Sequence, residues 1–161
     1  STQYRMQRCI AEYSNRMFYD GDLHHGHENK TWTIDNTDPL VGYHIEGDER
    51  TDSESHSKYK PGEASLVAEH IEELCSNGVP PRKIGVITPY GAQIGVIASE
   101  LRNRDITHPD QVEIDTIDSY QGSEREIIIV SFVRSNPHNS TGFLAFPDEG
   151  YRRLNVALTR A

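Results

Sequence analysis

Ile127-Ile128-Ile129-Val130-Ser131-Phe132-Val133 is the stretch that decides the fold of this 161-residue chain. Almost every position in it is apolar, so both faces of a strand built from it would be apolar. Such a strand is typical of the centre of a parallel sheet that helices cover on both sides. We therefore expect residues 127–133 to form a buried central strand.

Alternating strand and helix patterns surround this stretch. Residues 84–88 and 112–117 are short, rich in β-branched side chains and predict two further strands. Between them Ile94, Ile97 and Leu101 recur at helical spacing. The alternation implies an α/β fold with a parallel sheet and right-handed crossovers.

Another helix is predicted before these elements. Pro61-Gly62-Glu63 opens it, with an acidic residue near the positive end of the helix dipole, and Asn77-Gly78 ends it. The side chains expected to share its packing face are Leu66, His70, Ile71 and Leu74.

The N-terminal third of the chain is more polar. Residues 8–19 predict a short amphipathic helix, and residues 24–60 predict a polar surface insertion. Within that insertion, residues 40–45 predict a strand, and the charged, serine-rich run 46–60 predicts a mobile surface segment.

Polar segments directly follow the predicted strands. They comprise residues 88–90, 118–122 and 134–136. The carboxyl ends of parallel strands meet at one edge of a sheet, where ligands bind in open α/β folds. We expect these three segments to converge there.

The composition limits the kinds of partner. The net charge of −9 has the wrong sign for a protein whose whole surface holds nucleic acid, so any such contact must be local. Cys9 and Cys75 lie far apart without a CxxC partner, which favours reduced thiols. No apolar run is long enough to span a membrane, and we expect a cytoplasmic protein without a membrane partner.

The chain closes on residues 152–161, Arg-Arg-Leu-Asn-Val-Ala-Leu-Thr-Arg-Ala. This string resembles motif VI of superfamily 1 helicases almost letter for letter. In that motif the last arginine reaches the γ-phosphate of ATP, so the resemblance implies a catalytic role for Arg160. A guanidinium suits the task because it is permanently charged and its donors match phosphate oxygens.

Residues 2–6, Thr-Gln-Tyr-Arg-Met, resemble a second motif of the same superfamily. It belongs to the 1B subgroup, which includes the up-frameshift and immunoglobulin-mu-binding helicases. The resemblance implies that Tyr4 packs on the adenine, that Arg5 touches the γ-phosphate and that Gln3 belongs to the ATP site. Relatives usually continue with His-Pro, where this chain has Gln7-Arg8.

Residues 121–124, Gln-Gly-Ser-Glu, resemble motif V. There the glycine permits close approach to phosphate and the glutamate accepts a hydrogen bond from the ribose, which implies that Gly122 and Glu124 bind ATP. Relatives commonly have arginine or lysine where Ser123 stands and phenylalanine where Tyr120 stands.

Residues 88–93 resemble motif IV, which lies on the nucleic-acid track. Small hydroxyls and backbone amides grip phosphates without reading bases. Thr88 and Thr116 equally suit a role as strand caps, and Tyr90 suits either base stacking or the core. The track implied by the resemblance consists of Thr88, Pro89, Tyr90, Gln93, Thr116, Ser119, Arg134, Ser135 and Asn136.

Together these motifs imply a three-layer RecA-like domain of the P-loop NTPase type, with a mainly parallel sheet. Residues 1–161 would form the single C-terminal lobe of an ATP-dependent DNA or RNA helicase. The chain contains no glycine-rich P-loop. Its cofactors would be ATP and Mg²⁺, with the Mg²⁺ ligands on an N-terminal lobe, and the isolated chain would be inactive. The partners implied are that lobe and single-stranded DNA or RNA.

Three other functions fit parts of the sequence. The domain could be a nucleic-acid- or protein-binding module that derives from a helicase and has no motor activity. His24-His25-Gly26-His27 suggests a metal site but lacks acidic or cysteine ligands at a recognised spacing, so we expect no metal. Acidic residues near the second predicted strand suggest a nuclease, although strand alternation would scatter them. These residues are Asp115, Asp118, Glu124 and Glu126.

Overall fold

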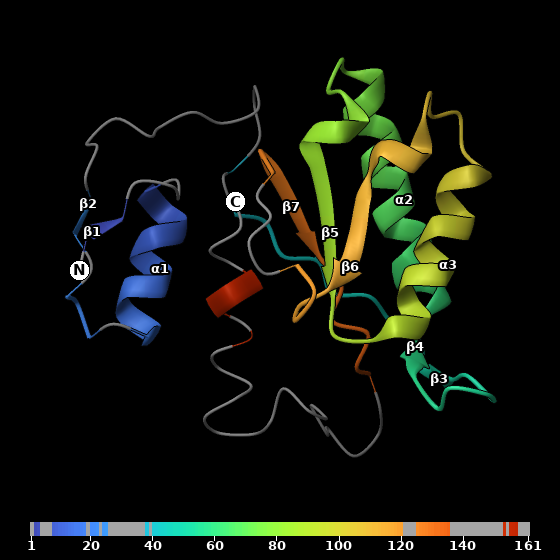
Figure 1. The fold of residues 1–161 in the computed structure, drawn as a ribbon, viewed down its shortest axis with the longest axis horizontal. Coiled ribbons are helices and arrows are strands. Elements are labelled where there is room, and N and C mark those ends of the chain that lie inside the picture. The colour runs from blue at the N-terminus through green and yellow to red at the C-terminus, as the bar shows by residue number, and fades with distance from the viewer. Residues whose placement is uncertain are drawn as a thin grey trace.

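Three parallel strands form the centre of the protein in the computed structural model (Figure 1). They are β5 (Ile84–Thr88), β6 (Glu113–Thr116) and β7 (Ile127–Val130), in the order β6-β5-β7. The structure describes residues 2–3, 8–18, 20–22, 24–25, 38, 40–120, 125–135, 153 and 155–157. The predicted parallel α/β sheet is confirmed.

Among the strands that the structure describes, β5 lies in the middle, whereas the sequence predicts a central position for residues 127–133. All five residues of β5 are buried, whereas those of β7 are half-buried. No strand in the described part of the chain pairs with the outer edge of β7. The sequence of β7 is nevertheless apolar toward both faces, as predicted. Strand order depends on crossovers, which the local pattern does not encode.

Strand β7 is also shorter than the predicted seven residues. It ends at Val130, although the Ser131 amide still donates to the Ile87 carbonyl across 2.9 Å. Val133 has a φ of 70°, an unfavourable value for a β-branched residue, so the chain turns away from the sheet there.

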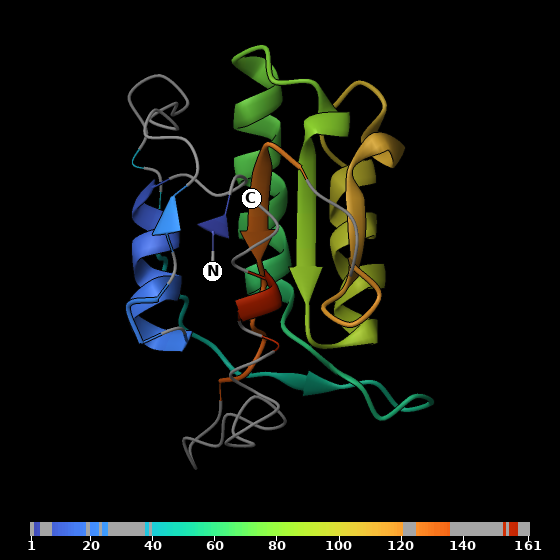
Figure 2. The same ribbon diagram turned by 60° about the vertical axis from the view of Figure 1, so that its left-hand side comes forward.

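Two helices cover one face of the sheet (Figures 1 and 2). Helix α3 (Gly91–Arg102) connects β5 to β6, and α2 (Pro61–Ser76) precedes β5 through the short turn η1 (Pro81–Lys83). A second short turn, η2 (Pro109–Gln111), leads into β6. The core under these helices contains Ala64, Val67, Ala68, Ile71, Ile84, Val86, Ile97, Leu101, Ile106 and Val112.

The packing face of α2 differs from the predicted one. Ile71 is buried as expected, but Leu66, His70 and Leu74 are only half-buried. Two alanines, Ala64 and Ala68, occupy the centre of the contact instead. Small side chains let α2 lie close to its neighbours, a geometric demand that hydrophobicity alone does not reveal.

The opposite face of the sheet carries a second core. Ile87, Ile117 and Tyr120 are buried there with Ala157, which belongs to the helical residues 155–157. Helix α1 (Arg8–Phe18), predicted over 8–19, lies farther out on this side, away from α2 and α3 (Figure 1). Layers on both faces of a parallel sheet confirm the three-layer α/β fold class. Near α1, β1 (Thr2–Gln3) and β2 (His24–His25) pair in parallel.

Residues 40–60 form a hairpin arm that runs past the carboxyl ends of the strands (Figure 2). The strand predicted at residues 40–45 is absent, because no strand in the described residues lies beside this stretch. The run 46–60, predicted to be a mobile segment, contains β3 (Arg50–Thr51) and β4 (Lys58–Tyr59) as an antiparallel hairpin. Its turn is closed by Asp52, whose Oδ1 accepts hydrogen bonds from the amide of Glu54 at 3.2 Å and from Ser55.

Candidate functional site

The carboxyl ends of the strands come together as the sequence predicts. Thr88 of β5 lies in register with Thr116 of β6, and the Ile117 amide donates to the Thr88 carbonyl at 3.1 Å. Ser131 lies on the other side of β5. The segments that begin at residues 88, 117 and 131 therefore meet at one edge of the sheet, which we call the carboxyl edge.

Thr88 caps the end of β5 with a side chain that is fully buried. Its Oγ1 accepts a hydrogen bond from the Tyr90 amide at 3.4 Å. Pro89 and Tyr90 are half-buried at the start of α3. The geometry favours the strand-cap role for Thr88 and leaves the backbone and ring of the next two residues at the surface.

A small hydroxyl cluster follows β6. The Thr116 hydroxyl donates to Ser119 Oγ at 3.0 Å and accepts from the Ser119 amide at 3.2 Å. Ser119 is exposed and Thr116 is half-buried. Both hydroxyls thus stand at the carboxyl edge, where a phosphate could compete for them.

A buried polar network lies beneath this edge and involves Gln93. The predicted contact of Gln93 with a nucleic-acid strand is not what the geometry offers, because its side chain is 0% exposed. Its Oε1 accepts from the Lys60 amide at 2.9 Å, and its Nε2 donates to Ser131 Oγ at 3.0 Å. The Ser131 hydroxyl donates to Glu63 Oε1 at 2.7 Å, and the same oxygen accepts from the Val133 amide at 3.0 Å.

The network joins three segments that are remote in sequence. Glu63 is predicted only as a favourable charge at the start of α2, and neither Lys60 nor Ser131 is among the predicted site residues. The one polar residue inside an apolar strand pattern, Ser131, was the available signal, since a buried hydroxyl requires a partner. The network holds the start of α2, the first turn of α3 and the end of β7 together.

Replacing Gln93 by leucine should destabilise the protein by about 2 kcal/mol, because the buried Lys60 amide loses its acceptor and the Ser131 hydroxyl loses the donor of one of its two hydrogen bonds. Urea unfolding with an unchanged m-value is the measurement. The exposed Gln111 offers a matched control, and its replacement by leucine should change the stability by less than about 0.5 kcal/mol. Equal effects of the two substitutions would contradict a structural role for the network.

Arg134 and Ser135, which follow β7, are both bound to Glu49 of the hairpin arm. Arg134 Nε lies 3.1 Å from Glu49 Oε2, and the Ser135 amide donates to the same oxygen at 3.0 Å. The Glu49 amide donates in turn to the Ser135 carbonyl at 3.2 Å. Glu49 is not among the predicted site residues, since its partner Arg134 lies 85 residues away in the chain.

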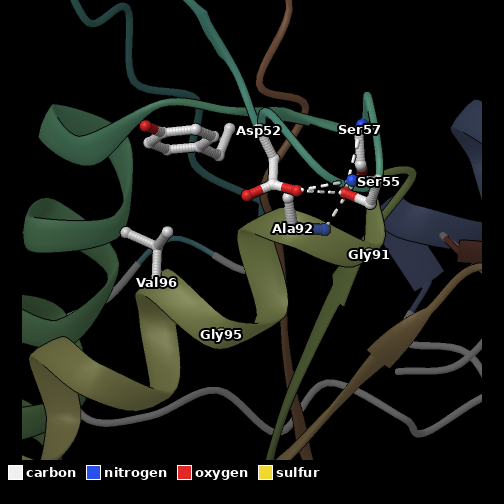
Figure 3. A pocket seen from close by; sticks show the side chains of 8 residues that line it. Asp52, Ser55, Ser57, Gly91, Ala92, Gly95 and Val96 are labelled. Atoms are coloured by element: carbon white, nitrogen blue, oxygen red, sulfur yellow. Dashed lines mark hydrogen bonds between the residues drawn. The ribbon is translucent and has the colours of Figure 1, made fainter.

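An open hollow of about 580 Å³ lies between the hairpin and the first turns of α3 (Figure 3). The Ser57 hydroxyl accepts from the Ala92 amide at 3.1 Å and so caps the helix start. Hydrogen bonds from Ser55 hold the pKa of the Asp52 carboxyl below its ordinary value. The hydrogen bond between Ser57 and Ala92 attaches the hairpin to the segment that resembles motif IV.

The end of the chain also reaches this region. Arg153 Nε lies 3.2 Å from Asp118 Oδ1, just beyond β6, and Ala157 packs on the face that contains Ile117. The segment that resembles motif VI thus begins beside the segment that leads to motif V. For Gln3 only the backbone in β1 is described, and the other predicted ATP-binding and catalytic residues lie outside the described residues, as does Asn136. Those ATP-binding and catalytic residues are Tyr4, Arg5, Gly122, Glu124 and Arg160.

Two described acidic residues of the nuclease alternative, Glu126 and Asp118, lie at opposite ends of the strands. Glu126 pairs with Lys83 at 2.8 Å at the amino end of the strands, whereas Asp118 pairs with Arg153 at the opposite end. Glu124 and His27 lie outside the described residues. Within the described residues no three His, Cys, Asp or Glu side chains are placed to hold a metal ion. Nor does any helix there have the length and apolar character of a membrane span.

The whole chain, residues 1–161, matches the family model described as an AAA domain. It is 38% identical over 184 aligned positions to the DNA polymerase alpha-associated DNA helicase A of Saccharomyces cerevisiae, covering 99% of this chain and 26% of that protein. It is 35% identical to the ATP-dependent helicase upf1 of Schizosaccharomyces pombe, covering 99% of this chain and 18% of that protein.

A third relative is the DNA-binding protein SMUBP-2 of Rattus norvegicus, at 37% identity over 100% of this chain and 17% of that protein. The chain thus spans about a quarter or less of the length of these curated relatives. The full-length family match, the parallel sheet and the likeness to named helicases agree with one another. The chain belongs to the AAA domain family, and the relatives named here are two helicases and a DNA-binding protein.

Proposed function

We propose that this chain is the second motor lobe of an ATP-dependent helicase and that its carboxyl edge is the track for single-stranded DNA or RNA. One observation carries the proposal: small hydroxyls, an arginine and backbone amides from three post-strand segments converge at this edge. Such groups suit phosphates of any sequence, as a motor requires. The contact is local, in keeping with the net charge of −9.

We assign the direct contacts to the surface members of the predicted track. Pro89, Tyr90, Thr116, Ser119, Arg134 and Ser135 are exposed or half-buried at the carboxyl edge. Thr88 and Gln93 have no exposed surface and act by positioning the start of α3. Asn136 remains part of the proposed track by its place in the sequence.

We also propose that ATP binds beside this edge, in the cleft toward another lobe. Arg5 and Arg160 would contact the γ-phosphate, and Tyr4 would pack on the adenine, with Gln3 in the same site. Gly122 would allow close approach to a phosphate, and Glu124 would accept a hydrogen bond from the ribose. Two guanidiniums, an aromatic ring and a carboxylate fit the chemistry of a nucleotide. The ion pair of Arg153 with Asp118 supports this arrangement, because it holds the start of the motif VI string at the carboxyl edge.

In this proposal the other lobe provides the phosphate-binding loop and the Mg²⁺ ligands. Charge that develops on the transferred phosphoryl group would be stabilised by the arginines of this lobe. Opening and closing of the cleft would alternate the grip of the two lobes on the strand and move it. The arginines are useful only when the cleft closes, so hydrolysis and stepping would be coupled.

The proposal predicts a division of labour between this chain and the full-length protein. The isolated chain should hydrolyse no Mg-ATP, whereas the full-length protein should hydrolyse it at a rate that single strands increase. A phosphate-release assay with and without homopolymeric DNA and RNA measures both. Turnover by the isolated chain would contradict the division of labour. Strand binding by the full-length protein without hydrolysis would favour the helicase-derived binding module.

A further inference from the structure

We propose that Glu49 sets how tightly the carboxyl edge holds a strand, because its carboxylate competes with a backbone phosphate for Arg134. This inference rests on the proposed function, since it concerns the same edge. It assigns a regulatory part to the hairpin arm, whose sequence suggested only a solvent-exposed insertion.

The contact between Glu49 and Arg134 is shielded and anchored. The two side chains are 11% and 17% exposed. The carboxylate accepts from both Arg134 Nε and the Ser135 amide, and the Glu49 amide donates back to the Ser135 carbonyl. Because its backbone is tied to the same turn, Glu49 cannot move far from the guanidinium while the arm stays in place.

The arm itself is anchored to α3 after Glu49. The Ser57 hydroxyl accepts from the Ala92 amide, and the Lys60 amide donates to Gln93 Oε1 at 2.9 Å. Within the arm, Lys60 Nζ donates to the Ile45 carbonyl at 2.6 Å, which links the segments before and after Glu49. Lys58 Nζ lies 3.8 Å from the other carboxylate oxygen of Glu49. The carboxylate is therefore a fixed feature of the edge.

A fixed carboxylate has a defined effect on a bound strand. It neutralises much of the charge of Arg134, and it repels a phosphate that approaches the same guanidinium. An arginine beside such a carboxylate holds phosphate more weakly than an arginine without one. Weak holding suits a track that must release the strand at every step, and it makes the arm a determinant of affinity.

The test measures single-strand affinity of the full-length protein at several salt concentrations, with a fluorescent homopolymer as the probe. Glu49→Gln should bind roughly tenfold more tightly. The slope of log affinity against log salt should steepen by about 0.7, the value for one added phosphate contact on a single strand. An amide oxygen can keep both hydrogen bonds of Glu49 Oε2, so the variant should fold, which thermal melting checks.

Two control variants separate charge from structure. Glu49→Asp keeps the carboxylate and should bind like the unmodified protein, whereas a purely structural role predicts that it weakens the turn. Glu54→Gln removes the same charge at the exposed tip of the hairpin and should leave affinity and salt slope unchanged. A gain from Glu54→Gln equal to that from Glu49→Gln would overturn the proposal, because net charge would then explain both.

A second pair of variants tests the proposal independently of how Glu49→Gln behaves. Arg134→Gln removes the guanidinium from the Glu49 carboxylate, which then keeps only the more distant Lys58 as a cation beside it. This variant should bind more weakly than the double variant with Glu49→Gln, since the double variant lacks the repulsion. The salt slope should be the same in these two, because neither has the guanidinium. Equal affinities would overturn the proposal. Absence of strand binding by the unmodified protein would instead refute the proposed function itself.

Discussion

Replacing Arg160 by alanine in the full-length protein should lower the rate of ATP hydrolysis by about 10³-fold while single-strand binding is largely retained. In the proposed function the guanidinium would act mainly when charge develops on the transferred phosphoryl group, so its loss should affect the transition state more than the bound strand. Steady-state ATPase assays beside equilibrium strand binding measure the two effects.

The expectation for related variants follows from the same reason. Arg160→Lys should also lose most of the activity, because a lysine keeps the charge without the planar fork of donors. Arg5→Ala should resemble Arg160→Ala, and the double variant should be little worse, since residues that act as a unit are not additive. Arg102, at the end of α3, is a matched control whose replacement by alanine should leave hydrolysis unchanged. Parallel loss of binding and hydrolysis in Arg160→Ala would point to a folding role.

Replacing Gly85 by alanine should destabilise the protein by about 3 kcal/mol, the upper part of the usual range for overpacking. A Cβ at this position of β5 would overlap the Tyr120 hydroxyl, and it would lie 2.9 Å from Tyr120 Cζ and 3.0 Å from Ile128 Cδ1. Tyr120 is 0% exposed, so its ring has no open space into which to move. Urea unfolding of the purified variants measures the change.

A double substitution tests whether the phenol is the cause. In a Tyr120→Phe background the overlap with the hydroxyl is gone, so Gly85→Ala should cost clearly less, although the contacts with the ring and Ile128 remain. Gly95→Ala is the matched control, because its Cβ would meet nothing within 4 Å and alanine is the better helix former. It should be neutral or stabilising. An equal cost of Gly85→Ala in both backgrounds would show that Tyr120 is not the obstacle.

This pair also explains a departure that the sequence shows but cannot interpret. The resemblance to motif V leads us to expect phenylalanine at position 120, and the additional hydroxyl of Tyr120 lies against Gly85, which has no side chain. Burial raises the pKa of the Tyr120 hydroxyl, and the neighbouring Glu113 carboxylate raises it further, so the side chain is a neutral phenol at physiological pH. The Tyr120 hydroxyl therefore occupies the space that a side chain at position 85 would need.

Most elements of the sheet and its covering helices were predictable, because each depends on a local period of apolar residues. The strands at residues 84–88 and 113–116 and helices α1, α2 and α3 lie close to their predicted positions. Their parallel arrangement follows from the alternation of strands with helices. The meeting of polar segments at the carboxyl edge follows from that arrangement.

The failures are of a different kind. Residues 40–45 have the composition of a strand, but no strand in the described residues lies beside them, and backbone pairing is what makes a strand. The polar run 46–60 has no apolar period, yet it contains the hairpin of β3 and β4 and makes hydrogen bonds with Ser135, Ile45 and the start of α3. Hydrogen bonds between distant segments leave no periodic trace in the sequence.

The sequence by itself determined the fold class, the family resemblance and the place of the polar motifs after the strands, since all of these depend on neighbours along the chain. Only the tertiary structure decided that β5 lies in the middle of the described strands, that Gln93 and Thr88 lie inside the protein and that Glu49 binds Arg134. The physical reason is that burial, strand order and ion pairing depend on which segments meet in space. These contacts join residues as far apart in the chain as Glu49 and Arg134, and no local sequence pattern predicts such a pair.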